Sequence, residues 1–162
     1  MINGWSLWSA WQHRLKEKED DARNLSVSLA RQAEDTFLQV DISLGEVVRH
    51  LRQNGPDYAA TPAFTRQLQE QQGKLTQLHS LSVFDAHGNR VATSGRAVPA
   101  TSNNADREYF IWHRTHADTN VHISHVTYSR STADLFIPVS VRLNDSAGNF
   151  AGIALAAVKV DY

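Results

Sequence analysis

The sequence predicts an α+β domain, with a long N-terminal helix followed by a five-stranded antiparallel sheet and flanking helices. Three observations support this class. Apolar residues recur at helical spacing from about residue 12 to residue 53, alternate with other residues from 135 to 143, and run almost unbroken from 150 to 160. The first pattern is typical of an amphipathic helix, the second of a strand with one buried face, and the third of a strand buried on both faces.

The composition is that of one globular domain. The 162 residues are 41% hydrophobic and 20% charged, with a formal net charge of -1. Because there is neither a basic excess nor an acidic run, we expect no nucleic-acid partner. The sequence has no cysteine, which excludes disulfides and thiolate metal sites.

The first eleven residues are unusually rich in tryptophan. Trp5, Trp8 and Trp11 are followed by four basic side chains, His13, Arg14, Lys16 and Lys18. Tryptophan concentrates at membrane–water interfaces, so we expect residues 1–11 to be the end of a helix that leaves a bilayer. No apolar run in the sequence is long enough to span one. A short amphipathic cap on a soluble dimer is the alternative.

The long helix is predicted from about Gln12 to Gln53, and Asn54-Gly55-Pro56 ends it. About 40 residues at 1.5 Å each make a helix of roughly 60 Å, which exceeds the width of a domain of this size. We therefore expect part of the helix to pair with a second copy. Residues 1–53 would be a membrane-proximal stub and a signalling and dimerisation helix, and residues 54–162 the body of the domain.

Caps, turns and periodicity predict the other elements. Thr61-Pro62 begins a second helix that ends near Gly73. Two short apolar runs flank Asp85-Ala86-His87-Gly88, which predicts a hairpin. A loop, a short helix and a strand follow at about residues 94–104, 106–116 and 122–128. Pro138 interrupts the alternating strand and predicts a bulge or an unpaired edge there, because proline has no backbone N–H to donate.

Several motifs together resemble the Cache (PDC) family of sensor domains. Asp106-Arg107-Glu108-Tyr109-Phe110, followed by Trp112-His113-Arg114, is similar to the ligand-binding helix of that family. The similarity continues through three later segments, Ser129-Arg130-Ser131-Thr132, residues 136–143 and residues 150–162. It covers about residues 25–162, and its order and spacing are specific over the last part of the chain. The whole looks like the first, membrane-distal module found ahead of GGDEF diguanylate cyclases.

The resemblance implies a PAS-like sheet and a periplasmic segment of a cell inner-membrane protein. It implies a proximal module, a further membrane helix and a cytoplasmic output domain after residue 162, with no catalysis in this chain. No Gly-Gly pair occurs, so the cyclase signature is absent. The expected function is ligand sensing for a diguanylate cyclase that controls c-di-GMP. A structural dimerisation or protein-binding module, or the sensor of a histidine kinase or chemoreceptor, is the alternative.

The resemblance also implies the ligand-binding residues. Arg107 falls where family members grip a ligand carboxylate, which a guanidinium does through paired charge-assisted hydrogen bonds. The alternative is that Arg107 completes a structural salt bridge. Tyr109 and Tyr128 match pocket positions, whereas Trp112 could line the pocket or not. Asp161 matches an acidic pocket position but could simply cap the last strand. The ligand would lie between the sheet and residues 94–116.

Arg130 departs from the pattern of the amino-acid-binding members, which carry an aspartate there for the ligand amine. A cation cannot hold an ammonium group, so we expect no α-amino acid ligand. Arg107 together with Arg130 would instead favour a dicarboxylate. The alternative is that Arg130 points to solvent.

Metal and enzyme signatures are weak or absent. Two His-x-x-His pairs occur, His113 with His116 and His122 with His125. On a strand, residues three apart point to opposite faces, so the second pair cannot reach one metal ion. We expect no metal and no cofactor. No Gly-x-Ser-x-Gly elbow, phosphate loop or His-Glu-x-x-His motif is present, so we expect no enzymatic activity in this chain.

Overall fold

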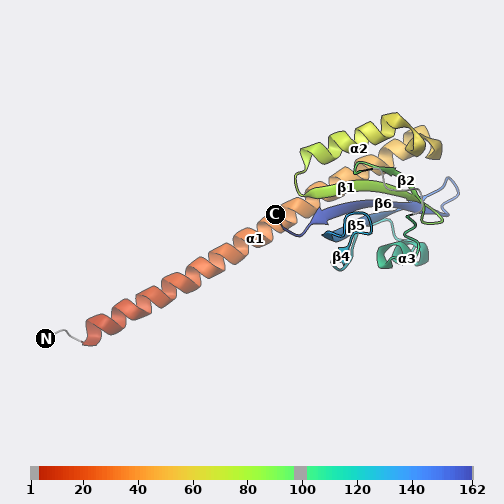
Figure 1. Ribbon diagram of the computed structural model, residues 1–162. Coiled ribbons are helices and arrows are strands. Elements are labelled where there is room, and N and C mark those ends of the chain that lie inside the picture. Colours follow the sequence, from red (N-terminus) through yellow and green to blue (C-terminus); the bar gives the residue numbers. More distant parts are fainter. Residues whose placement is uncertain (1–3, 97–101, 162) are drawn as a thin grey trace. The chain divides into compact units, whose positions relative to one another are not determined.

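The computed structural model describes residues 4–96 and 102–161. The chain forms two compact units, Met1–Leu38 and Gln39–Tyr162. The second unit contains a sheet with helices on both of its faces (Figure 1). The predicted α+β class is therefore confirmed. Of the predicted loop over residues 94–104, residues 97–101 lie outside the described part of the chain.

The long helix, α1, runs from Gly4 to Asn54 and so begins before the predicted Gln12. Of the predicted stub, residues 1–3 lie outside the described residues. Within the described residues, no helix combines the length and the apolar character needed to cross a bilayer. In the first unit, the side chains of Trp8, Trp11, Leu15, Leu25 and Leu29 are exposed.

The part of α1 in the second unit is buried along one side. Val40, Leu44 and Val47 are each no more than 2% exposed. The helix ends where the sequence predicted, because Gly55 adopts a φ of 85°, a conformation that glycine reaches without strain. A hydrogen bond of 2.9 Å from Gly55 N to Leu51 O closes the last turn.

Two helical elements follow. A 3-10 helix, η1, spans Pro56–Ala60, and α2 spans Pro62–Lys74. Thr61 begins α2 as predicted, since its side-chain hydroxyl accepts a hydrogen bond of 3.3 Å from the backbone N of Phe64. Phe64 and Leu68 are fully buried, and α2 packs against β1.

The sheet is antiparallel, with the order β2-β1-β6-β5-β3 and with β4 also paired to β5. The strands are β1 Leu78–Asp85, β2 Arg90–Thr93, β3 His122–Ile123, β4 Thr127–Tyr128, β5 Leu135–Asn144 and β6 Phe150–Lys159. The predicted hairpin turn joins β1 to β2, with Gly88 at a φ of 84°.

The predicted strand over residues 122–128 is interrupted, so the sheet has six strands among the described residues instead of the predicted five. Of the bulge or unpaired edge predicted at Pro138, the bulge does not occur, because Pro138 pairs in register with Ala157 of β6, whereas its outer side lies in neither the β3 nor the β4 register. The Pro138 carbonyl faces the outer strand, where it accepts a hydrogen bond of 2.9 Å from Ser124 N. The nitrogen of a strand residue points the same way as its carbonyl, and proline has no hydrogen there to donate. The outer ladder therefore breaks between β3 and β4.

The third helix, α3, spans Glu108–Thr115 and covers the sheet face opposite to α2 (Figure 1). Its buried residues Tyr109 and Phe110 pack with Phe84 of β1 and with Ile153 and Leu155 of β6. This packing fixes the start of α3, where the Cache-like motif lies, against the middle of the sheet.

Candidate functional site

A cavity of about 640 Å³ lies on the α3 side of the sheet. Strands β1 and β2 contribute polar side chains, including Ser82, Thr93 and Arg90. The start of α3 contributes Arg107 and Tyr109, and the segment 129–134 closes another side. From the segment 94–116, where the ligand was predicted to bind, Gly95, Arg96, Asn104, Arg107 and Tyr109 line this cavity.

Arg107 occupies the position just before the first turn of α3. Its Nη1 donates to Thr127 Oγ1 at 3.0 Å and its Nη2 donates to the carbonyl oxygen of Tyr128 at 2.9 Å. Its Nε is buried and has no hydrogen-bond partner among the described residues. Both acceptors are neutral, and Arg107 forms no ion pair with a carboxylate in the described part of the chain.

Arg130 is held differently, although it lines the same cavity. Its two terminal nitrogens donate to the two carboxylate oxygens of Asp106 at 2.9 and 2.7 Å, and Nη1 also donates to Asn103 O at 2.7 Å. Hydrogen bonding to Arg130 lowers the pKa of Asp106, and the same contact raises the pKa of Arg130. Both groups therefore stay ionised and neutralise each other at physiological pH.

Tyr109 is the buried wall of the cavity, at 2% exposure. Its hydroxyl accepts a hydrogen bond of 2.9 Å from Asn104 Nδ2. Burial raises the pKa of the phenol, so Tyr109 is neutral at physiological pH. Its hydroxyl hydrogen can then be donated to an acceptor in the cavity.

Arg90 was not among the sequence-predicted site residues. It begins β2 and lines the cavity, with its guanidinium 5.5 Å from the centre of the Phe84 ring. Its side chain forms no ion pair or hydrogen bond with the described residues, and its Nε is buried. Burial lowers the pKa of Arg90. No motif marks this residue, because only the strand register shows which face of β2 it occupies.

The other three predicted residues lie outside the cavity lining. Trp112 stacks between the rings of His116 and His122, with centroid separations of 3.7 and 4.3 Å. The Tyr128 side chain is exposed, and only its carbonyl oxygen contacts Arg107. Asp161 follows β6 and is exposed. The structure thus brings together Arg107, Tyr109 and Arg130 of the predicted set.

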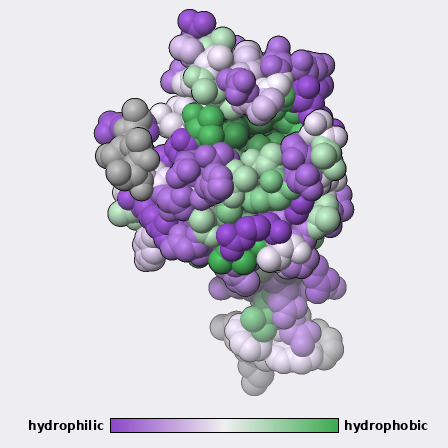
Figure 2. Space-filling view, turned by 90° about the vertical axis from the view of Figure 1, so that its right-hand side faces the viewer, coloured by the Kyte–Doolittle hydropathy of each residue, from purple (hydrophilic) through white to green (hydrophobic). Residues whose placement is uncertain are grey.

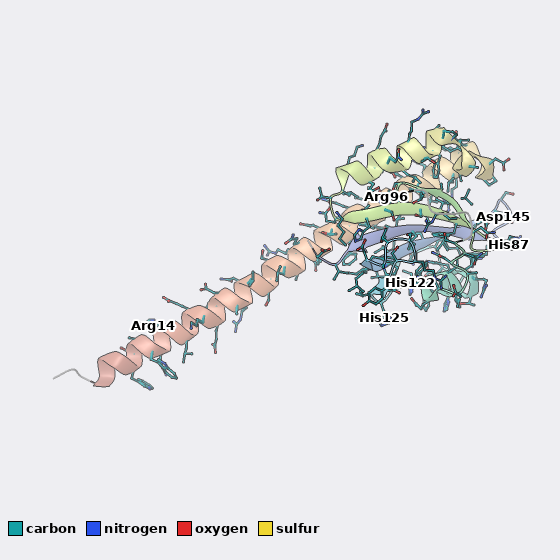
Figure 3. All side chains as sticks on the ribbon, viewed as in Figure 1. Arg14, His87, Arg96, His122, His125 and Asp145 are labelled. Atoms are coloured by element: carbon teal, nitrogen blue, oxygen red, sulfur yellow. The ribbon has the colours of Figure 1, made fainter. Side chains whose placement is uncertain are left out.

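The histidines of the α3 region form a cluster with no metal geometry. His113 is fully buried, with Nε2 2.9 Å from Ser140 Oγ, and burial lowers its pKa to about 4, with a further contribution from nearby His122. His122 Nε2 lies 3.2 Å from Glu108 Oε1. His122 and His125, labelled in Figure 3, come from the segment facing α3. Among the described residues, no group of three or more potential ligands could hold a metal ion.

A second hollow, of about 710 Å³, has mainly apolar walls. Figure 2 looks onto this end of the molecule and shows hydrophobic residues gathered in the middle of the face. Two turns of the same form, Asp-x-x-Gly-Asn, lie at its rim, and in each the aspartate accepts backbone hydrogen bonds from its own turn. Asp85 and Asp145 are thus engaged in holding the turns.

Comparison with known proteins gives matches among solved structures. No family model matches the chain, and no curated protein matches it. The extracellular domain of rpHK1S-Z16, described as a histidine kinase, is 33% identical, with a TM-score of 0.79 over 90% of this chain and 58% of that one.

Two further structures share the fold at lower identity. The sensory domain of the Campylobacter jejuni chemoreceptor Tlp3, with isoleucine bound, is 12% identical, with a TM-score of 0.67 over 98% of this chain and 64% of that one. The V. cholerae histidine kinase DctB sensor domain is 14% identical, with a TM-score of 0.63 over 94% and 58%. The chain therefore covers less than two thirds of the length of each of these three structures.

These matches define the class of the fold: it is shared with the extracellular domain of one histidine kinase and with the sensor domains of a chemoreceptor and a second histidine kinase. More particularly, the chain has the fold of the Cache-like (PDC) sensor domains that its motifs resemble. Its predicted position ahead of a GGDEF cyclase stays a prediction.

Proposed function

We propose that this chain is the ligand-sensing segment of a transmembrane signalling protein, and that it binds a carboxylate-bearing metabolite through Arg107. The observation that carries the proposal is that Arg107 lines a cavity while its hydrogen bonds go to neutral oxygens. A structural arginine is expected to be paired with a carboxylate, as Arg130 is with Asp106. An arginine without such a pair can bind a ligand carboxylate with charge-assisted hydrogen bonds.

The rest of the cavity suits a small polar ligand. Ser82, Thr93 and Asn104 supply hydroxyl and amide groups, and Leu155 and Phe136 supply apolar surface. Ligand sites commonly combine apolar walls with a few polar groups that fix orientation. The neutral hydroxyl of Tyr109 would give a carboxylate a second donor near Arg107.

An α-amino acid is a poor fit to this arrangement. The Tlp3 domain binds isoleucine, and the family pattern uses an aspartate to hold the ligand amine. Arg130 occupies that position here, and the carboxylate nearest to it, that of Asp106, is already engaged. We therefore favour a carboxylate ligand without an α-amine.

Signal transmission would use α1. Exposed apolar side chains of its first unit come in pairs four residues apart, Trp11 with Leu15 and Leu25 with Leu29, and at about 3.6 residues per turn the two pairs lie toward the same side of the helix, which favours pairing with a second copy. Ligand binding can shift such a pair between two arrangements only through different affinity for each. We expect the domain to lie on the periplasmic side of an inner membrane and to be connected to that membrane by flanking helices. The output domain is predicted to be a diguanylate cyclase on the motif resemblance, whereas two of the three relatives described are histidine kinases.

A thermal-shift screen tests the proposal. The panel contains monocarboxylates, dicarboxylates and amino acids, and the variant is Arg107→Ala. A ligand at 100 times its dissociation constant adds about 2.7 kcal/mol to the free energy of unfolding. We expect a carboxylate to raise the melting temperature of the wild type but not of the variant. If no compound raises it and the variant is simply less stable, Arg107 is a structural residue and the chain is a dimerisation or protein-binding module.

A further inference from the structure

Arg90 is the least compensated charge of the cavity. Its guanidinium is half-buried and touches the face of Phe84, yet no carboxylate or hydrogen-bond acceptor reaches it among the described residues. A partly buried charge without a partner is costly, because burial removes hydration that nothing replaces. The lowered pKa of Arg90 has the same cause.

The charges around Arg90 leave the cavity strongly positive. Arg130 is neutralised by Asp106, so Arg90, Arg96 and Arg107 face one other lining carboxylate, that of Asp134. The segment 97–101 is not described, but its sequence Ala-Val-Pro-Ala-Thr contains no acidic residue that could serve as a counter-ion. An anionic ligand in the cavity would supply negative charge that the described lining lacks.

We infer that the ligand carries two carboxylates, one bound by Arg107 and the second by Arg90. This inference rests on the proposed function and names the ligand class for the same cavity. The sequence suggested Arg130 as the residue that binds the second carboxylate. The inference assigns this role to Arg90, because the guanidinium of Arg130 already donates to Asp106. The cavity of about 640 Å³ has room for a short dicarboxylate and ordered water.

The test compares matched ligands that differ by one carboxylate. Dissociation constants are measured by calorimetry for succinate against butyrate and for glutarate against pentanoate. The proteins are the wild type, Arg90→Gln, Arg107→Gln and Arg114→Gln. Arg114 is the control, because its guanidinium also lies over a phenylalanine ring, at 6.0 Å from Phe110, but it does not line the cavity.

The wild type and the Arg114 variant should prefer the dicarboxylate of a pair by roughly tenfold or more, as expected for a desolvated charge pair. Arg90→Gln should abolish this preference and keep the binding of the monocarboxylate. Arg107→Gln should weaken both members of a pair. The melting temperature of the ligand-free Arg90 variant should equal or exceed that of the wild type, because an unpaired charge has been removed.

The two possible failures are distinguishable. The inference of a dicarboxylate ligand is overturned if Arg90→Gln keeps the full preference for the dicarboxylate over the monocarboxylate. It is also overturned if the wild type shows no such preference. In both cases carboxylate binding through Arg107 stands. Binding that is unchanged in Arg107→Gln overturns the proposed function itself. A ligand-free Arg90 variant that melts well below the wild type, with unchanged preference, makes Arg90 a structural residue and also overturns the inference.

Discussion

Arg130 and Asp106, 24 residues apart in sequence, form a two-point ion pair in which the guanidinium nitrogens donate to both carboxylate oxygens at 2.9 and 2.7 Å. The pair connects the first residue of the α3 motif to the segment 129–134, which lines one side of the cavity. The sequence suggested that Arg107 and Arg130 bind the ligand together, but the ion pair gives the two arginines different roles. Arg130 forms an ion pair within the chain, whereas Arg107 forms none with the residues that the structure describes.

This ion pair predicts the result of a charge swap. Arg130→Asp places a second carboxylate beside Asp106, so the melting temperature should fall. The double variant Asp106→Arg with Arg130→Asp restores opposite charges and should recover most of the loss. Thermal denaturation at low salt measures both, because the pair is largely exposed and salt screens it. A double variant no more stable than the single one would show that the contact does not contribute.

His113 predicts a dependence of stability on pH. Its pKa is lowered to about 4 in the folded chain from 6.5, so the unfolded chain binds more protons between these values. The contribution of His113 is full above about pH 6.5 and decreases as the pH falls toward 4, by up to about 3 kcal/mol. Denaturant titrations of wild type and His113→Gln over this range measure the effect.

The control for this titration is His87→Gln, because His87 is exposed on the β1–β2 turn. The His113 variant should lose part of the slope of stability against pH, even if it is less stable overall, and the His87 variant should keep the full slope. Equal slopes in the wild type and the His113 variant would show that His113 is not held neutral by burial.

Gly152 predicts a large loss of stability on substitution. It has a φ of 138°, and a Cβ at this position would overlap the backbone carbonyl oxygen of Phe84 on β1. Gly152→Ala should therefore cost more than about 3 kcal/mol, since neither backbone can move without breaking the β1–β6 ladder. Gly45→Ala is the control, because nothing lies within 4 Å of its added Cβ and it is in a helix, where alanine is favoured by about 1 kcal/mol. Chemical denaturation of both variants tests the contrast.

Pairing of α1 predicts a pattern of disulfide crosslinks. The chain has no cysteine, so single cysteines can be introduced without background. Leu15→Cys and Leu25→Cys lie on the exposed apolar stripe and should form dimers on mild oxidation, whereas Arg23→Cys, off this stripe, should not. Non-reducing gels of the whole chain report the result. Crosslinking that is equal at all three positions, or absent at all, would argue against a specific helix pair.

The order of the elements was predictable because each has a local cause. Thr61-Pro62 begins α2, Gly55 ends α1, and the unbroken apolar run of residues 150–160 gives the central strand β6. The break between β3 and β4 was not predicted. It depends on which neighbour Pro138 faces, and that is decided by the pairing of β5 with β6 on its other side.

The candidate site was predictable only in part, for a related reason. The motif around Arg107 is continuous in sequence, and the structure places it at the cavity with Tyr109. Arg90 enters the same cavity from β2 through the register of a hairpin, and the partner of Arg130 comes from a distant segment. Trp112 is drawn away from the cavity by its stacking between two histidines. Contacts of this kind arise from tertiary structure and leave no local signal.

The most direct test of the account is the affinity of Arg107→Lys for the carboxylate that most stabilises the wild type. Lysine keeps the charge but lacks the planar fork that can hold Thr127, Tyr128 O and a ligand together. Calorimetry should show binding weakened by roughly tenfold or more, about 1.4 kcal/mol, while the ligand-free melting temperature changes little. An unchanged dissociation constant in this variant would contradict the assignment of Arg107 as the ligand-binding residue.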